Sequence, residues 1–364
     1  MLTKGDDFPL HQLPEPIAYA GSDRNFYDRY FFNGYSRSEA CFFALALGVY
    51  PVLNIMDASF SIIKDGTQYN LRASRHLGME RMDTRVGPIA VEVLEPLKTL
   101  RIHVDQNAYG IQADLIFRNR SIPLEEPRYI HRVGPRVIMD YTRLTQNGAY
   151  SGFFEVNGSR VTIEPENWMG TRDRSWGVRP VGARDPQMPG EMAIPQFYWL
   201  WAPVNFEDCI TLYDINADAS GNAWHTHGVM VPVGDGQEPV HMQKAKSRMH
   251  FKSGTRHAAS AEITLVTPTE EILEIQVSPL YHFYMSGIGY MHPDWSHGLD
   301  KGELAVAHDT IDLKTADPAN PMNLHIQAVS EFRMKGKTGM GVLEQLIIGP
   351  HAPSGFTDIL DMAP

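Results

Sequence analysis

The sequence predicts an all-β protein built from two antiparallel β-barrel or β-sandwich domains in tandem, with few short helices. Three observations favour this fold class. Short segments alternate apolar and polar residues with a period of two, the pattern of half-buried strands. Turn residues separate these segments, and the 364 residues include 30 Gly and 25 Pro, as expected of a loop-rich β protein. Amphipathic segments of helical period do not alternate with the strands, so a doubly wound α/β fold is not expected.

In the first half, three hairpins are predicted in chain order. Residues 59–64 and 67–72 flank Asp65-Gly66, which favours a tight turn because Gly accepts a positive φ. The other two hairpins pair 100–104 with 111–117 and, around Asn157-Gly158, 152–156 with 159–163. The aromatic segment 25–33 is expected to form an edge strand packed on the core, with a ligand-lining face as the alternative. Residues 36–49 fit either a short buried helix or a strand.

The second half repeats this pattern. Its predicted strands are 197–201, 209–214, 223–231, 261–266, 271–277, 303–307 and 324–329. Prolines and glycines cluster in 179–196, which is the best candidate for a connection between domains. The sequence therefore predicts a first domain over 1–180 and a second over 181–364.

Composition and charge narrow the classes of partner. The 32 Lys and Arg against 43 Asp and Glu give a net charge of −11, which argues against nucleic acid. The basic trio Lys244, Lys246 and Arg248 fits the solvated face of a strand. Cys41 and Cys209 are expected to be buried free thiols. The first ten residues lack the apolar stretch of a secretory signal, and the longest apolar run, 40–53, is too short to span a membrane. We expect a cytoplasmic protein without an integral membrane segment, and the oligomeric state stays open.

The distinctive chemistry lies in the middle and late parts of the chain. All six Trp fall between 168 and 295, and eleven of the fifteen His follow Trp224. The densest polar cluster, residues 170–179, contains Arg172, Asp173, Arg174, Trp176 and Arg179. Arginines that pair with a carboxylate and stack on indole would form a rigid charge network. Such a cluster is either a structural corner or a site in which Asp173 donates protons. Because a nearby Arg lowers the pKa of Asp173, it could act as a general acid only if burial outweighs that pairing.

A second cluster occupies residues 287–298. Tyr290, His292, Asp294, Trp295 and His297 lie between glycines and have the composition of a pocket wall. His292 and His297 are candidate proton shuttles, and a His–Asp pair that orients an imidazole is chemically reasonable, although such pairs are also common in structural loops. A purely structural loop is the alternative.

The third cluster is His225 and His227, which follow Trp224. On a strand both imidazoles project to the same face, an arrangement that suits a metal. The Glu and third His of a metal-binding barrel do not follow, so a hydrogen-bonding pair is the preferred interpretation. Sequence templates for a nucleophile elbow, a P-loop, a zinc protease, a Cys pair and a dinucleotide site are also missing, so no cofactor is expected.

Three segments carry a resemblance to a family of bacterial proteins. They are 25–34 (NFYDRYFFNG), 170–179 (GTRDRSWGVR) and 289–298 (GYMHPDWSHG). Arg174 stands where many relatives have His. More distantly, the chain resembles the group that contains carotenoid hydratases, AttH-like proteins and pericyclases. This resemblance implies two lipocalin-like domains in tandem, an apolar ligand held within or between them, and hydration or cyclisation of a polyene. No catalytic residue of the hydratases can be matched to a position here.

Together these observations predict a protein that binds a hydrophobic small molecule of terpenoid, steroid or polyketide type and performs cofactor-independent acid–base chemistry on it. The expected catalytic groups are Asp173, Asp294 and His297. The expected ligand contacts are Arg172, Trp176, Arg179, Trp199, Trp224, His225, His227, Tyr290, His292 and Trp295. A non-catalytic carrier or sensor, and a metal enzyme built on His225 and His227, are the alternatives. An aspartate on the cavity wall would favour the enzyme, and aspartates buried in Arg pairs would favour the carrier.

Overall fold

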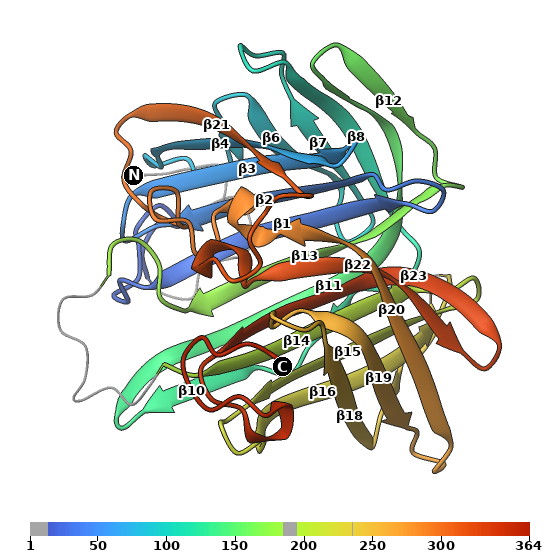
Figure 1. Ribbon diagram of the computed structural model, residues 1–364. Coiled ribbons are helices and arrows are strands. Elements are labelled where there is room, and N and C mark those ends of the chain that lie inside the picture. Colours follow the sequence, from blue (N-terminus) through green and yellow to red (C-terminus); the bar gives the residue numbers. More distant parts are fainter. Residues whose placement is uncertain (1–13, 185–194, 235) are drawn as a thin grey trace.

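The computed structural model describes residues 14–184, 195–234 and 236–364. In these residues the protein consists of two curled antiparallel sheets, the upper and lower halves of Figure 1, with only short 3₁₀ turns. The turns used below are η2 (Met285–Ile288) and η3 (Pro321–Asn323), and a third, η4 (Ala352–Ser354), lies near the end of the chain. The predicted all-β class with tandem lipocalin-like sheets is confirmed.

The first sheet has 14 strands, and most of the first half of the chain contributes to it. Its main path runs β21-β4-β3-β2-β1-β13-β11-β8-β7-β6-β5, and β9, β10 and β12 also pair with β11. The strands are β1 (Phe26–Ser36), β2 (Phe42–Tyr50), β3 (Ile55–Lys64), β4 (Thr67–His76), β5 (Arg85–Val86), β6 (Ile89–Glu95), β7 (Thr99–Val104), β8 (Ile111–Asn119), β9 (Leu124–Glu125), β10 (Tyr129–Val133), β11 (Arg136–Val156), β12 (Ser159–Ile163), β13 (Trp168–Val178) and β21 (Leu304–Asp312).

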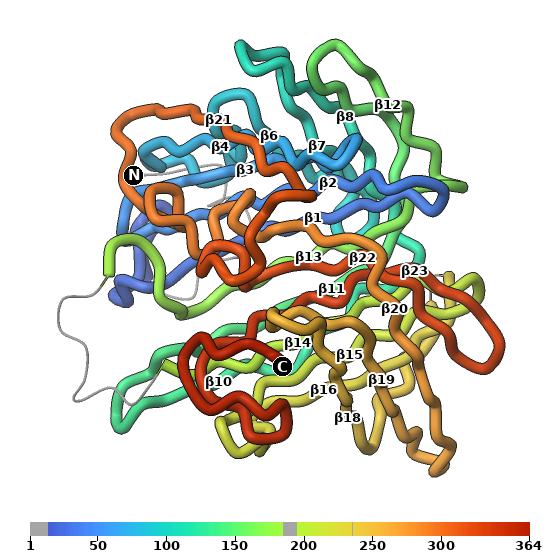
Figure 2. Tube along the Cα trace, viewed as in Figure 1, coloured from blue at the N-terminus to red at the C-terminus, as the bar shows by residue number. Residues whose placement is uncertain are grey.

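The second sheet has 9 strands in the order β17-β16-β15-β14-β23-β22-β20-β19-β18. They are β14 (Phe197–Asn205), β15 (Cys209–Ala217), β16 (Ala223–Pro232), β17 (Val240–His241), β18 (Lys244–Phe251), β19 (Ala258–Val266), β20 (Ile272–Tyr284), β22 (Ile326–Met334) and β23 (Lys337–Ile348). After β20 the chain passes to the first sheet, adds β21 to its edge and then returns, as the orange trace of Figure 2 shows. Residues 185–194 of the predicted domain connection lie outside the described residues.

Local sequence signals specify the hairpins well. Asp65 and Gly66 have φ of 53° and 78°, and Asn157 and Gly158 have φ of 50° and 76°. Two successive positive φ angles match the right-handed twist of the flanking strands, which is why these dipeptides close tight hairpins. The hairpins β3–β4 and β11–β12 are thus confirmed. Of the two possibilities for residues 36–49, the strand is correct.

The edge position expected for residues 25–33 is wrong. Strand β1 lies inside the sheet, paired with β2 on one side and β13 on the other. It is apolar on both faces: Phe32 packs inside the curled first sheet, whereas Phe31 packs between the two sheets. A strand with two apolar faces gains most from an interior position, where both faces are covered.

Three layers of side chains make up the main core. One fills the inside of the first sheet, one fills the inside of the second, and a third lies between the two sheets. Cys41 and Cys209 are buried free thiols, as predicted. The basic trio on β18 lies on that strand's exposed face. No helix among the described residues has the length and apolar character needed to cross a membrane.

Candidate functional site

The alternation of strand β13 divides the central polar cluster between two faces. Arg172 and Trp168 lie on the inner side of the first sheet, where Arg172 donates to Oε1 of Gln146 from Nε (2.9 Å) and Nη2 (2.6 Å). Arg174 lies on the same face and pairs with Asp28 at 2.6 Å. Asp173 points the other way, toward the second sheet.

The Arg–Asp network expected for this cluster does not form. Among the described residues the Asp173 carboxyl makes no hydrogen bond and no ion pair, because its arginine neighbours in sequence leave from the opposite face of the strand. Arg172 has its own partners inside the first sheet, and Trp176 is exposed at the surface. Neither is placed to contact a ligand that also contacts Asp173.

A cleft of about 450 Å³ lies between the sheets. Its wall is mostly apolar and aromatic, and comprises Met139, Tyr141, Arg143, Arg179, Pro180, Phe197, Trp199, Tyr290, Met291, His325, Glu344, Leu346 and Ile348. A smaller, more enclosed chamber of about 40 Å³ adjoins it. The chamber wall comprises Tyr27, Arg29, Phe31, Tyr141, Arg143, Asp173, Ser175, Arg179, Met285, Tyr290 and Glu344. Five of these residues line both spaces, so the apolar cleft continues into a polar inner end.

Asp173 forms part of that polar end. Burial raises the pKa of its carboxyl to about 7, and the positive charges of Arg143 and Arg29 offset this only in part. The carboxylates of Glu126 and Glu344 add to the rise. Near neutral pH a large share of the Asp173 carboxyl groups therefore carries a proton. An unpaired carboxylic acid of this pKa on a cavity wall is suited to donate that proton.

A His–Glu pair lies on the same wall and was not anticipated from the sequence. His325 Nε2 is 2.7 Å from Oε1 of Glu344, which also accepts from Trp199 Nε1 at 3.3 Å. Oε2 of Glu344 accepts from Gln327 at 2.7 Å. Burial raises the pKa of Glu344, but these hydrogen bonds and the nearby Arg143 outweigh it and lower the pKa. Glu344 is thus a carboxylate, and a carboxylate accepts only.

This contact fixes which tautomer the neutral form of His325 adopts. Because a carboxylate only accepts, Nε2 donates to Glu344, and in the neutral ring the lone pair then lies on Nδ1. His325 Nδ1 is buried and without a hydrogen-bond partner among the described residues. A carboxylate that fixes the tautomer and orientation of an imidazole, with the second nitrogen free, is a recurring arrangement of general bases.

His297 is held differently. Its Nδ1 lies 2.8 Å from Arg29 Nη1 and 3.5 Å from Arg179 Nη2, and its Nε2 donates to the carbonyl of Ile288 at 2.9 Å. Burial, together with the two guanidinium charges, holds the pKa of His297 well below its usual range. The imidazole is therefore neutral and fully engaged, so its structure favours a role in positioning Arg29 over the predicted role as a proton shuttle.

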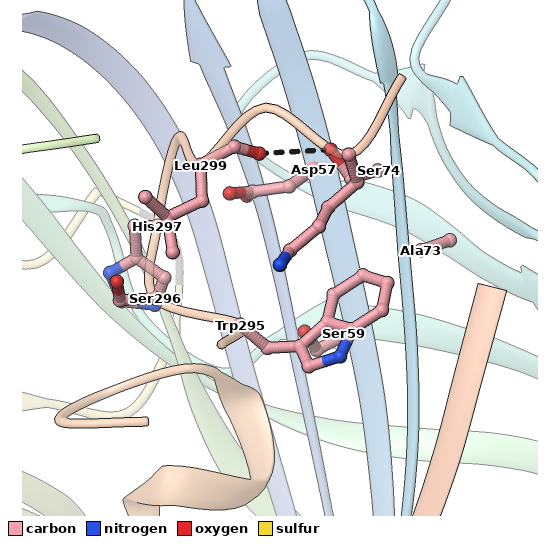
Figure 3. A pocket seen from close by; sticks show the side chains of 9 residues that line it. Asp57, Ser59, Ala73, Ser74, Trp295, Ser296, His297 and Leu299 are labelled. Atoms are coloured by element: carbon pink, nitrogen blue, oxygen red, sulfur yellow. Dashed lines mark hydrogen bonds between the residues drawn. The ribbon is translucent and has the colours of Figure 1, made fainter. Parts of the chain in front are cut away.

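The other members of the late cluster lie outside the cleft. Asp294 is exposed, and its backbone N–H donates to His292 Nδ1 at 3.1 Å. Figure 3 shows Trp295 and Leu299 against β3 and β4, with the Ser74 hydroxyl bonded to the Leu299 carbonyl at 3.4 Å. The pocket between them measures about 10 Å³, room for one water molecule at most. Only Tyr290 of this cluster lines both the cleft and the chamber.

His225 and His227 belong to a buried network behind the cleft. Both lie on one face of β16, as alternation predicts, and approach Asp214 at 2.6 Å and 3.4 Å. Asp214 also accepts from Tyr129 at 3.0 Å, and the Tyr129 hydroxyl accepts from Arg143 at 2.6 Å.

Neither imidazole lines the cleft. Trp224 stands outside it as well, with its ring 5.0 Å from that of His131. The part of the chain that the structure describes contains no group of three or more His, Cys, Asp or Glu placed to hold a metal ion.

Of the predicted contacts, Arg179, Trp199 and Tyr290 lie with Asp173 at the cleft and its chamber. The additional ionisable or charged residues there include Arg29, Arg143, His325 and Glu344. His325 and Glu344 could have been found from one sequence feature, the hairpin closed by Lys335 and Gly336. These two residues have φ of 50° and 75°. The register of this hairpin sets Gln327 opposite Glu344, and this brings His325 to the same face.

Comparison with known proteins bears on the family and the fold. A family model described as "Family of unknown function (DUF8625)" matches residues 2–357. No curated protein matches the sequence significantly. A protein from Nitrosomonas europaea assigned as AttH has a similar structure, with a TM-score of 0.55 and 11% identity over 93% of this chain and 98% of that one.

Two further structures are less similar. They are kievitone hydratase from Nectria haematococca (TM-score 0.46, 10% identity, 88% of each chain) and CghA with Sch210972 (TM-score 0.44, 9% identity, 89% of each chain). The match to the AttH protein confirms the distant resemblance in fold.

Proposed function

The chain belongs to the DUF8625 family, and we propose that this protein binds an apolar small molecule in the cleft between its sheets and moves protons on it without a cofactor. The observation that carries this proposal is Asp173: a half-buried carboxyl with no partner among the described residues and a pKa raised to about 7, on the wall of a chamber open to an apolar cleft. A carrier has no use for such a group, since an unpaired carboxyl that is partly withdrawn from water costs stability.

The cleft suits an apolar compound of terpenoid, steroid or polyketide type. Met139, Phe197, Leu346 and Ile348 supply aliphatic and aromatic surface within its volume of about 450 Å³. The aromatic ring of Phe197 lines the cleft, and an aromatic face stabilises a nearby cation by about 0.5–2 kcal/mol in comparable pairs. The polar groups gather at one end, so the apolar part fixes which bond of the ligand meets them.

Two proton transfers account for the chemistry. The Asp173 O–H bond breaks and its proton goes to one carbon of an alkene, leaving the carboxylate and a cation at the neighbouring carbon. His325 Nδ1 then takes a proton from the adjacent carbon, which completes an isomerisation, or from a water that adds, which completes a hydration. Exchange with solvent returns the proton to Asp173 and removes it from His325. Glu344 holds the imidazole in place throughout.

The experiment begins with the ligand that co-purifies with the full-length protein, identified by native mass spectrometry and extraction, and followed in turnover assays. Asp173→Asn and His325→Gln are expected to lower kcat about 10²–10⁴-fold, the usual contribution of a general acid or base. Arg174→Gln, on the same strand but the opposite face, is the matched control and should retain wild-type turnover. A ligand that binds and is released unchanged would identify a carrier and refute the catalytic proposal.

A further inference from the structure

The inner chamber contains two buried guanidinium groups with unused hydrogen-bond donors. Arg29 Nε and Arg179 Nε are both buried and have no acceptor among the described residues. The Arg29 residue is 2% exposed. Both arginines line the chamber of about 40 Å³, alongside Tyr27 and Ser175. Buried N–H groups without an acceptor are rare in folded proteins because each loses its hydrogen bond to water.

These arginines also form no ion pair among the described residues, and their positive charges act only at longer range on the carboxyls of Asp57 and Asp173. Among the described residues, no carboxylate lies within 4.0 Å of either guanidinium. Arg29 donates to the Ile288 carbonyl at 3.5 Å, and both arginines approach the neutral imidazole of His297. They also lie over aromatic faces, Arg179 at 4.4 Å from Tyr27 and Arg29 at 4.8 Å from Tyr290.

Arg143, by contrast, pairs with Glu126 at 2.5 Å, and Arg172 gives two hydrogen bonds to Gln146. Burial of a charge is costly unless a counter-charge joins it, so the chamber is built to receive an anion.

The size of the chamber and its position restrict that anion. About 40 Å³ admits a group of a few heavy atoms, since roughly 10–15 Å³ of cavity volume measured in this way holds one water molecule. Five residues of its wall also line the apolar cleft, so a group in the chamber continues directly into a body in the cleft.

We propose that Arg29 and Arg179 bind an anionic oxygen of the substrate, a carboxylate or the enolate of a 1,3-dicarbonyl group, and that the substrate is therefore an amphipathic molecule held head-first in the chamber. This inference rests on the proposed function and names its substrate class. With the anionic group bound by the two arginines, the neighbouring bonds of the substrate lie near Asp173 and Glu344, which line the same chamber.

The test uses the full-length protein and three probes that share one apolar body: naphthoate, naphthoylacetone as the enolisable 1,3-dicarbonyl, and methyl naphthoate. Isothermal titration calorimetry gives their affinities. We expect naphthoate, naphthoylacetone or both to bind at least about tenfold more tightly than the ester, as charge-assisted hydrogen bonds to Arg allow. The preferred probe identifies which anionic head the chamber takes.

Variants separate the chamber from the cleft. Arg179→Gln and Arg29→Gln should remove the preference for the anionic probe and leave the affinity for methyl naphthoate unchanged, whereas Arg179→Lys should retain part of it. Arg174→Gln is the control and should keep the full preference. A crystal structure with the preferred probe would then show its oxygens at hydrogen-bond distance from Arg29 Nε and Arg179 Nε, a readout that does not require the Arg29 variant to fold.

The remaining outcomes separate failure of the anion subsite from failure of ligand binding as a whole. If the ester binds as tightly as the anionic probes, or if the Gln variants keep the anion preference, the anion subsite is wrong, and binding of an apolar ligand in the cleft still stands. If none of the three probes binds, the proposed ligand-binding function fails as well.

Discussion

The carboxyl of Asp173 is subject to two opposing effects, burial and the positive charge of neighbouring arginines. In the sequence three arginines surround it, and a close Arg lowers a carboxyl pKa. On the strand, Arg172 and Arg174 leave from the other face, and the arginines that remain near Asp173 form no ion pair with it. Burial therefore dominates and raises the pKa to about 7. The result is an acid that holds its proton near neutral pH.

This raised pKa predicts a pH-dependent cost in stability. An unfolded Asp releases its proton near pH 4, whereas folded Asp173 holds it to about pH 7, so the folded state binds more protons in between and stability falls as pH rises through that window. Asp173→Asn removes the effect. The quantity to compare is the unfolding free energy of the variant minus that of wild type. This difference should be about 2 kcal/mol more favourable to the variant at pH 8 than at pH 5. Chemical denaturation at the two pH values measures this.

The control for that measurement is Asp294→Asn, because Asp294 is exposed. Its difference from wild type should be the same at both pH values. A pH-independent difference for Asp173→Asn as well would show that the Asp173 carboxyl is ionised throughout, and the role of Asp173 as a general acid would then be lost.

Glu344 is the opposite case, a buried carboxyl whose pKa is lowered because three side chains donate to it. Its folded pKa lies below the unfolded value, so its contribution is present above about pH 4.5 and is lost as pH falls through the folded pKa. Glu344→Gln should cost about 3 kcal/mol near neutral pH, since breaking a buried hydrogen-bonded charge leaves its donors unpaired.

Thermal and chemical unfolding of this variant test the point. Glu331→Gln on β22 is the control, because its partner Arg333 is largely exposed and such pairs contribute little. Equal stabilities for the two variants would contradict the assignment of Glu344 as the buried centre of the hydrogen-bond group.

Strands β1, β13 and β11 carry a row of glycines across the sheet that supports the site. Gly34 pairs with Gly170, and Gly170 pairs with Gly148. The rings of Phe43 and Phe117 occupy the space beside the outer two, and a Cβ at Gly170 would lie 2.0 Å from the carbonyl oxygen of Asn33. The row lets backbone and aromatic rings approach closely where the sheet bends, a recurring use of glycine in strands.

Gly170→Ala should therefore destabilise the protein by about 3 kcal/mol, because the added methyl group collides with backbone that cannot move without breaking the β1–β13 pairing. The melting temperature measured by circular dichroism reports it. Gly21→Ala is the matched control, since a Cβ there meets nothing within 4 Å. A wild-type melting temperature for Gly170→Ala would mean that the close approach of β1 and β13 at this row is not required.

Prediction from the sequence succeeded where the signal was local. The Asp65-Gly66 and Asn157-Gly158 hairpins and the shared face of His225 and His227 depend only on residues a few positions apart. The interior position of β1 was missed because its partner β13 lies far away in the sequence. The 170–179 segment was interpreted as a compact cluster, yet strand alternation separates Asp173 from Arg172 and Arg174. His325 and Glu344 meet only through the register of β22 and β23.

The two sheets are joined by polar contacts as well as by an apolar core. Arg120, which follows β8 in the first sheet, donates to Asn205 at 2.8 Å and to the carbonyl of Phe206 at 2.9 Å in the second. Asn33 of β1 donates to Gln327 of β22 at 2.9 Å, and Gln327 in turn donates to Glu344. Glu344, which positions the candidate base His325, is thus bonded to Gln327, and Gln327 is held by Asn33 of the other sheet. The site therefore depends on the association of the two sheets.

The chain also crosses between the sheets in a way that makes the halves interdependent. Residues from β20 to β21 belong to the second half of the sequence, yet they cover the outer face of β4. Gln68 donates to the Tyr284 carbonyl at 2.9 Å, and Arg72 donates to the Ser286 carbonyl at 2.9 Å and pairs with Asp309 at 2.7 Å. A first half that ends before residue 185 would expose these buried groups and lose the pairing of β4 with β21.

We therefore predict that residues 1–184, expressed alone, do not fold cooperatively, whereas the same fragment joined by a flexible linker to residues 284–314 gains a cooperative thermal transition. The added segment restores the acceptors of Gln68 and Arg72 and closes the exposed edge of β4, and an open sheet edge promotes aggregation. Circular dichroism and limited proteolysis of the two fragments make the comparison. A cooperative transition in the short fragment, at a temperature close to that of the full chain, would instead establish residues 1–180 as an independent domain and the β21 crossover as an addition to it.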